Sequence, residues 1–254
     1  MTANAHVEER PNHTATDTDR PICLTCTDVH AYYGESYVVQ GVSFTVRHNE
    51  ILALLGRNGA GKTSILRTLA RASQPVLRRG EIWLDDQALH GMRDFQAARA
   101  GVGLVPEDRR IIGGLSVEQN LIVAQVAPSP GWSLERIYER FPRLADRRRQ
   151  EATTLSGGEQ QMLAIARMLA RDVRLVLLDE PYEGLAPQIV REIETIVADI
   201  RAHGITTIIV EQNAMAALEL ADRAVIVDMG QIAFAGSAQD VLDDKSLRDE
   251  YLAI

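Results

Sequence analysis

The sequence predicts an α/β fold in which a mixed sheet core carries an antiparallel β subdomain and an inserted helical subdomain. Three observations lead to this prediction. Short, continuous apolar runs end in polar residues, which is typical of strands buried on both faces of a parallel sheet. Other stretches alternate apolar and polar residues, as antiparallel strands with one solvated face do. A long helical pattern separates the first two apolar runs.

The first part of the chain is predicted to be a tail followed by antiparallel strands. Residues 1–21 are polar and aperiodic, which predicts a disordered tail, and residues 22–254 are expected to form one domain. The strands are expected in the stretches CLTCTDVHAYY, VVQGVSFTV and GEIWLDDQAL. Cys23 and Cys26 have C-x-x-C spacing, but no second cysteine pair completes a zinc site, so we interpret them as small strand residues.

The rest of the chain supplies the buried strands and the helical subdomain. The runs EILALLG, RLVLLDE and ITTIIV are the expected parallel strands. Helical patterning over about residues 115–170, interrupted by Pro128, Pro130 and Pro142, predicts a helical subdomain over about residues 108–170. The stretch AVIVDMGQIAFAG predicts a closing hairpin with its turn at Met229 and Gly230.

Composition excludes several classes of function. The net charge of −8 disfavours a broad basic face for nucleic acid, and 5% aromatic residues disfavour a stacking surface for single strands. No apolar run approaches the roughly 18–20 residues that span a bilayer, and the N-terminus lacks the pattern of a signal peptide. We therefore expect a cytoplasmic protein that reaches a membrane only through a partner.

A phosphate-binding loop follows the first buried run. The sequence matches G-x-x-x-x-G-K-[ST] in full, between a strand pattern and a helical pattern. Its glycines let backbone N–H groups surround phosphate oxygens, Lys62 is placed for the β- and γ-phosphates, and the Thr63 hydroxyl is placed for Mg²⁺. The predicted nucleotide-binding residues of this loop are Gly56, Arg57, Asn58, Gly59, Ala60, Gly61, Lys62, Thr63 and Ser64.

Two carboxylates end the second buried run. Asp179 and Glu180 close the sequence LVLLDEP, where both side chains can reach one cleft. A carboxylate near the phosphate loop would hold Mg²⁺, and a second would orient and deprotonate an attacking water. We predict Asp179 as a metal ligand and Glu180 as the catalytic base.

A second glycine turn, LSGGEQQ, opens a strong helical pattern. Ser156 with Glu159 three residues later predicts a capping box, and Gly157 and Gly158 place two free amides at the positive helix end. The turn has no lysine, so it predicts an anion site without a cation. Such a site suits a phosphate whose charge is neutralised by another subunit's lysine and Mg²⁺, and Ser156, Gly157, Gly158 and Glu159 are the predicted contacts.

The order of these motifs resembles the ABC-type ATPases. A phosphate loop, then LSGGEQ, then LLDEP, is that family's pattern, and the resemblance covers about residues 22–253. It implies a P-loop NTPase fold of ABC type that binds and hydrolyses ATP with Mg²⁺. It also implies that two domains pair head to tail, so that each signature turn closes over the nucleotide bound to the other. Tyr33 occupies the position where the family has an aromatic ring that stacks on adenine. Residues 184–187 occupy the position of the loop that touches the other subunit in that family.

Several segments resemble the ATP-binding subunits of branched-chain amino acid importers, whose relatives move urea or short amides. These segments are YGESYVVQGVSF, VPEDRR, LSVEQNL, FPRL and VEQNA. In the wider family Glu107 is usually Gln and Gln212 is usually His. The resemblance implies that Glu107 approaches the metal and that Gln212 takes part in catalysis. A Gln donates an N–H but carries no positive charge, so we expect weaker transition-state stabilisation than from His.

The resemblance also implies partners and a location. The partners are a homologous second ATPase subunit (or a second copy when isolated), transmembrane permease subunits and, indirectly, an extracytoplasmic solute-binding protein. The chain would lie at the cytoplasmic face of the cell membrane. Two alternatives stay open: an exporter ATPase, for example for lipopolysaccharide, and a soluble ABC ATPase acting on DNA or ribosomes. The absence of heptads between Lys62 and Ser156 and the acidic net charge disfavour the soluble class.

Overall fold

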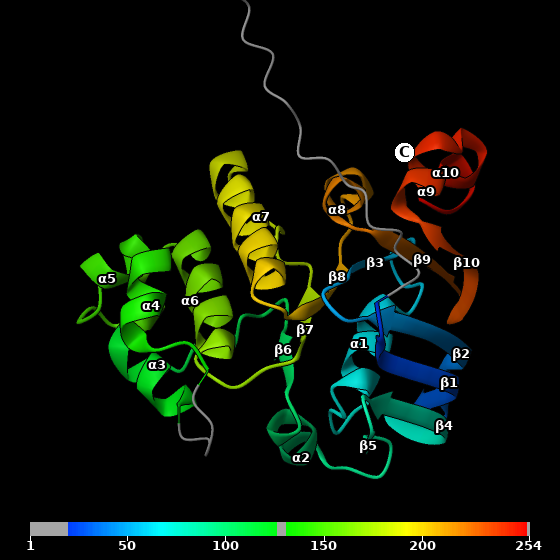
Figure 1. Cartoon of the computed structure of the whole chain (residues 1–254), viewed down its shortest axis with the longest axis horizontal. Helices are drawn as coiled ribbons and strands as arrows, with labels where there is room; N and C mark the ends of the chain where they lie inside the picture. Colours follow the sequence, from blue (N-terminus) through cyan, green and yellow to red (C-terminus); the bar gives the residue numbers. More distant parts are fainter. Residues whose placement is uncertain (1–19, 126–130, 253–254) are drawn as a thin grey trace, which may run out of the picture.

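The core of the molecule is a six-stranded sheet in the order β10-β9-β3-β8-β7-β6. The computed structural model describes residues 20–125 and 131–252. Strands β9, β3, β8, β7 and β6 run parallel, and β10 pairs antiparallel with β9 (Figure 1). The strands are β3 (Ile51–Leu55), β6 (Val102–Val105), β7 (Leu175–Asp179), β8 (Thr206–Val210), β9 (Arg223–Asp228) and β10 (Gln231–Ser237).

A four-stranded antiparallel sheet in the order β2-β1-β4-β5 stands beside the core (Figure 1). Its strands are β1 (Ile22–Tyr33), β2 (Ser36–Arg47), β4 (Val76–Leu84) and β5 (Gln87–Ala88). Strands β1 and β2 match two of the stretches predicted to be antiparallel, and the third stretch, GEIWLDDQAL, holds the end of β4 and all of β5. The hairpin of β9 and β10 also turns where predicted, because Met229 and Gly230 both adopt positive φ, at 44° and 79°.

The helices follow or separate the core strands. Helices α3 to α6 gather into the helical subdomain at one side of the molecule (Figure 1). The helices are α1 (Lys62–Leu69), α2 (Asp94–Arg99), α3 (Val117–Ala124), α4 (Leu134–Arg140), α5 (Pro142–Asp146), α6 (Gly157–Leu169), α7 (Pro187–Ala202), α8 (Ala214–Leu220), α9 (Ala238–Asp243) and α10 (Lys245–Tyr251), with a 3₁₀ turn at Ala152–Thr154.

The core sheet is covered on both faces, as its continuous apolar runs predict. Leu52 and Leu54 of β3 join a cluster with α1 and the antiparallel sheet, while Ile51, Ala53 and Leu55 join a cluster with α6, α7 and α8. All five residues of β3 are buried, as are those of β7 and β8. The strand ends that carry chemistry are therefore fixed by packing on two sides.

The helical subdomain is fastened to the core by arginines. Arg140 pairs with Asp199 of α7, and Arg143 lies 3.8 Å from Glu192 of the same helix. Both arginines therefore make ion pairs within the fold. The pairs fix α4 and α5 against α7.

Other predictions meet the structure less closely. The sequence pattern did not indicate β6, a short strand interrupted by Gly103. Almost all of the predicted tail, residues 1–19, lies outside the described residues, as do Pro128 and Pro130. Pro142 interrupts the helical pattern as predicted: α4 ends at Arg140, and Pro142 begins α5, because its fixed φ suits a first helical position. Within residues 20–125 and 131–252, no helix is both long and apolar enough to span a bilayer.

Candidate functional site

The phosphate loop lies between β3 and α1, in contact with two other strands. A Cβ on Gly56 would lie 2.2 Å from the carbonyl oxygen of Val227, and one on Gly61 would lie 3.1 Å from that of Val38. Both glycines have positive φ, at 144° and 108°. Only glycine satisfies both the backbone conformation and the close approach at these positions. The loop is thereby held at the carboxyl end of the core strands.

The structure brings half of the predicted site residues, nine of eighteen, into one open pocket of about 240 Å³. Residues of the phosphate loop and α1 form one wall, and three later segments supply Glu107, Glu180 and Gln212. The complete lining is Asn58, Gly59, Gly61, Lys62, Thr63, Ser64, Glu107, Glu180 and Gln212. Because these side chains come from four separate parts of the sequence, the fold assembles a polar pocket from the predicted motifs.

Lys62 is held inside the loop. Its ammonium donates to the carbonyl oxygens of Gly56 at 2.8 Å and Arg57 at 3.1 Å, and its side chain is 5% exposed. Burial lowers the pKa of Lys62, and the carboxylates of Glu180, Asp179 and Glu211 oppose that shift. A phosphate bound in the loop would give the Lys62 ammonium a charged partner in place of these two neutral carbonyl oxygens.

Thr63, which lines the pocket, contacts Asp179 at the end of β7. The Thr63 hydroxyl donates to Oδ1 of Asp179 at 2.8 Å, while Oδ2 of Asp179 is buried and has no hydrogen-bond partner. A buried carboxylate oxygen without a partner costs about 1–3 kcal/mol or more. This donor set, a hydroxyl beside an orphaned carboxylate oxygen, fits a hard cation such as Mg²⁺. Glu107 lines the same pocket with an exposed carboxylate.

Glu180 and Gln212 are joined by a hydrogen bond. Nε2 of Gln212 donates to Oε2 of Glu180 at 2.6 Å, and Oε1 of Gln212 accepts from Nδ2 of Asn58 at 3.4 Å. Glu180 has a positive φ of 48°, a strained conformation held by its backbone N–H, which donates to Val210. Gln212 therefore bridges the predicted base and the phosphate loop.

Glu211 is a buried acid beside Gln212 that the sequence analysis did not single out. It is 4% exposed and accepts a hydrogen bond from the backbone N–H of Tyr182 at 2.9 Å. Burial raises the pKa of Glu211 to about 7, with the N–H of Tyr182 opposing the shift and the Glu180 carboxylate adding to it. The sequence signal that could have identified Glu211 is an acidic residue next to Gln212 at the end of a buried apolar run. Glu211 links the loop after β8 to the loop after β7.

The signature turn begins α6 with the predicted capping box. The backbone N–H of Ser156 donates to Oε2 of Glu159 at 2.9 Å, and the N–H of Glu159 donates to the Ser156 hydroxyl at 3.4 Å. That hydroxyl donates to the same carboxylate at 2.7 Å, and Arg147 lies 2.7 Å from its other oxygen. Gly158 packs on α7, where a Cβ at this position would lie 2.9 Å from the side chain of Ile189.

The prediction of a cation-free turn is wrong. Nη1 of Arg109 lies 3.1 Å from the position that a Cβ of Gly157 would occupy. No local pattern indicates this contact, because Arg109 comes from the loop after β6 and reaches α6 only through the packing of the helical subdomain. The signature turn therefore has a guanidinium beside its glycines.

Two parts of the predicted site stay apart from the pocket. None of Ser156, Gly157, Gly158 or Glu159 lines it, and neither does Tyr33. Tyr33 ends β1, where it pairs with Ser36 of β2. The separation of the signature turn from the chain's own phosphate loop is what a site shared between two subunits requires.

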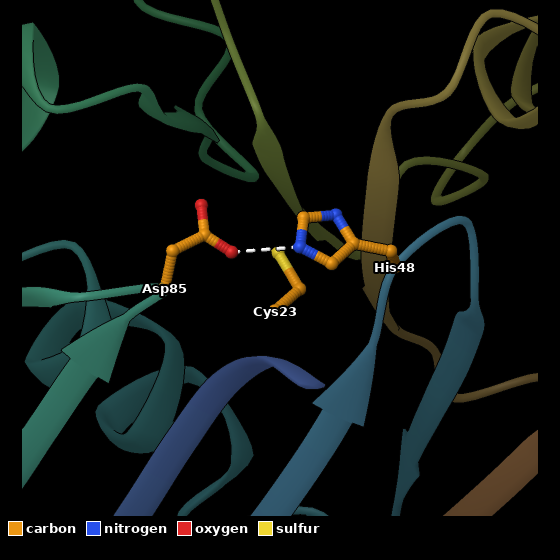
Figure 2. Close-up of side chains that lie close together, drawn as sticks. All are labelled: Cys23, His48 and Asp85. Atoms are coloured by element: carbon orange, nitrogen blue, oxygen red, sulfur yellow. Dashed lines mark hydrogen bonds and ion pairs between the residues drawn. The ribbon is translucent and has the colours of Figure 1, made fainter. Parts of the chain in front are cut away.

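A third cluster lies at the opposite end of the core strands. Figure 2 shows the side chains of Cys23, His48 and Asp85 directed toward one another, with their ligating atoms within 4.8 Å. Nε2 of His48 lies 2.7 Å from Oδ1 of Asp85, and Arg174 lies 2.8 Å from Oδ2. Because both oxygens of Asp85 already have partners, and burial raises the pKa of the Cys23 thiol, we assign the cluster a structural role. We call His48, Asp85 and Arg174 the clasp.

Comparisons with known proteins agree with the geometry. The family model described as ABC transporter matches residues 39–183. The chain is 40% identical over 232 residues to the high-affinity branched-chain amino acid transport ATP-binding protein BraG of Pseudomonas aeruginosa, covering 90% of this chain and 99% of that protein. It is 30% identical over 224 residues to the probable branched-chain amino acid transport ATP-binding protein LivF of Archaeoglobus fulgidus, covering 87% and 94%.

Two further comparisons complete the assignment. The chain is 35% identical over 224 residues to the lipopolysaccharide export system ATP-binding protein LptB of Acidithiobacillus ferridurans, covering 87% and 92%. A nucleotide-free ATP-binding cassette from an ABC transporter shares its fold, with a TM-score of 0.78, 22% identity, and coverage of 92% and 99%. The predicted P-loop fold of ABC type and the resemblance to the branched-chain importer type are confirmed. The chain belongs to the ABC transporter family, and it carries that family's ATPase domain.

Proposed function

We propose that this chain is the ATP-hydrolysing subunit of an importer of branched-chain, hydrophobic amino acids or of a related small amide such as urea. The pocket that collects Lys62, Thr63, Glu107, Glu180 and Gln212 beside the orphaned oxygen of Asp179 is the observation that carries the ATPase part. The similarity to BraG, which is higher than that to LptB and spans nearly the whole of BraG, supports import over export.

Each side chain of the pocket has a role in this proposal. The loop amides and Lys62 bind the phosphates. Thr63 and Asp179, with Glu107 nearby, would hold Mg²⁺, which when bound neutralises charge on the β- and γ-phosphates. Glu180 orients the attacking water and takes its proton. Gln212 holds the Glu180 carboxylate through its hydrogen bond and can donate to the γ-phosphate when that bond exchanges.

The proposal includes a head-to-tail pair of ATPase subunits. The signature turn of each subunit closes over the nucleotide in the phosphate loop of the other. Hydrogen bonds to charged groups contribute about 1.5–3 kcal/mol each, so three such donors supply on the order of 5–9 kcal/mol per site before entropy losses. Changing a two-state equilibrium from almost fully open to almost fully closed needs about 5.5 kcal/mol. ATP binding therefore closes the pair, and loss of the γ-phosphate opens it.

Permease subunits would hold the chain at the cytoplasmic face of the membrane. A groove of about 320 Å³ between the core and the helical subdomain is lined by Pro106, Ile112, Val123 and other residues of that region. Ile112 and Val123, which line it, expose 36% and 49% of their surface, which is unusual for neighbouring apolar side chains. We assign this groove to a permease segment that transmits the closing motion.

Replacement of the predicted base tests the ATPase mechanism. Glu180→Gln should lower the hydrolysis rate by roughly 100-fold or more while leaving the affinity for a fluorescent ATP analogue intact, because the amide cannot take a proton from water. The control is Glu139→Gln, which removes an exposed carboxylate of α4. A Glu180→Gln variant that hydrolyses ATP at the parent rate would remove Glu180 as the base.

The transported solute requires the assembled complex. Hydrolysis by the reconstituted subunits and permease, with the solute-binding protein present, should rise when leucine, isoleucine or valine is added. If only urea stimulates hydrolysis, the transported solute is instead a small amide. Stimulation by neither, together with stimulation by lipopolysaccharide, would contradict import.

A further inference from the structure

Arg109 lines the groove assigned to a permease segment, but the proposed ATPase mechanism gives its charge no task. It is partly buried, and its guanidinium lies against Gly157, with Nη1 and Nη2 at 3.1 and 3.6 Å from the position of a Cβ there. Within residues 20–125 and 131–252, the Arg109 guanidinium forms neither a hydrogen bond nor an ion pair with a carboxylate. The absence of a side chain at position 157 is what lets the guanidinium come this close.

The backbone of the loop is strained to place Arg109 there. Arg109 and Arg110 are consecutive residues with positive φ, at 58° and 44°, and each such residue costs about 1–2 kcal/mol. The loop is held in place because Arg167 donates to the carbonyl of Arg110 at 2.8 Å and Ile112 donates to Asn120 at 3.1 Å. The side chain of Arg110, in contrast, pairs with the exposed Asp108 at 3.3 Å.

The charges around the turn leave it attractive to an anion. The N-terminus of α6 is positive because of the helix dipole, and the guanidinium adds a full charge beside it. The nearby Glu159 does not neutralise Arg109, since its carboxylate already accepts from Ser156 and pairs with Arg147. Two positive groups held side by side by the fold are best explained by a negative group that binds both.

One short loop serves two sites. Glu107 lines the chain's own phosphate pocket, whereas Arg109, two residues later, reaches the signature turn and does not line that pocket. We propose that Arg109 donates to the terminal phosphate of the ATP held by the phosphate loop of the partner subunit. The inference rests on the proposed head-to-tail pair and adds to it a guanidinium contact from outside the signature turn.

The experiment follows ATP-dependent pairing of a hydrolysis-deficient parent, Glu180→Gln, by light scattering as Mg–ATP is added. Adding Arg109→Ala should raise the ATP concentration for half-maximal pairing by at least about tenfold, since one charge-assisted contact per site is lost. Arg109→Lys, which keeps the charge without the planar fork, should give an intermediate shift. Arg110→Ala is the matched control on the same loop and should change this concentration less than about twofold.

Two further readouts separate this role from a structural one. The melting temperature and the affinity of the unpaired subunit for a fluorescent ATP analogue should be the same in Arg109→Ala as in the parent. If the parent pairs and Arg109→Ala pairs at the same ATP concentration, the inference is overturned and the proposed function stands. A parent that stays unpaired at saturating Mg–ATP would overturn the proposed pair, and the inference with it.

Discussion

At the scale of single residues, Glu211 makes the stability of the protein depend on pH. Its pKa of about 7 in the folded state lies above the value of about 4.3 expected in an unfolded chain. The folded state therefore binds more protons between these values, and stability should fall as pH rises from about 4 through 7, by on the order of 3 kcal/mol in total.

Glu211→Gln should remove this dependence. Its amide oxygen can still accept from the N–H of Tyr182, but it does not ionise. Urea unfolding at a series of pH values between 5 and 8 measures the effect. The control Glu219→Gln, at an exposed position on α8, should keep the pH dependence of the unmodified protein. A Glu211→Gln protein that still loses stability as steeply would show that another group carries the effect.

At the scale of elements, α3, α6 and α9 of the described helices begin with a serine capping box, and only α6 begins at the proposed nucleotide site. Ser116 caps α3 by accepting from the N–H of Gln119 at 3.2 Å, as Ser156 caps α6. Ser116→Ala and Ser156→Ala should each lower the free energy of unfolding by about 1 kcal/mol. In the Glu180→Gln background only Ser156→Ala should also weaken ATP-dependent pairing, because Ser116 is not part of the signature turn. Equal pairing by the two variants would contradict the role of that turn.

The same elements show what the sequence could predict. Continuous apolar runs identified β3, β7 and β8, because burial on both faces leaves an unambiguous pattern. The sequence pattern did not predict β6, because a short apolar run that contains glycine resembles a loop. Ser156 and Glu159 could be paired from their spacing alone, because a capping box is a local structure.

Contacts between distant segments were beyond the reach of local patterns. The approach of Arg109 to Gly157 depends on a left-handed backbone at two arginines, which no propensity predicts. The hydrogen bond between Gln212 and Glu180 depends likewise on how β7 and β8 end side by side. The motifs predicted the candidate site residues, and the tertiary packing decides which of them touch.

At the scale of the whole molecule, the clasp joins the antiparallel sheet to the core. His48 follows β2, Asp85 follows β4, and Arg174 precedes β7. Asp85→Asn should lower the free energy of unfolding by about 1 kcal/mol, since these side chains are partly solvated and exposed ion pairs contribute little. The loss should shrink in 1 M salt, where charges are screened within about 3 Å. Asp86→Asn, at an exposed neighbouring position, is the control, and an equal loss in both variants would contradict this assignment.

The position of the clasp bears on how the molecule can bend. It lies at the amino ends of the parallel strands, whereas the phosphate loop follows β3 at their carboxyl ends. With the two sheets tied together at that edge and packed against each other in one apolar cluster, we expect them to rotate as a single rigid unit when nucleotide is exchanged. We then expect the hinge in the connections that enter and leave the helical subdomain, and the ion pairs of Arg140 and Arg143 with α7 would have to exchange partners as the proposed pair opens and closes.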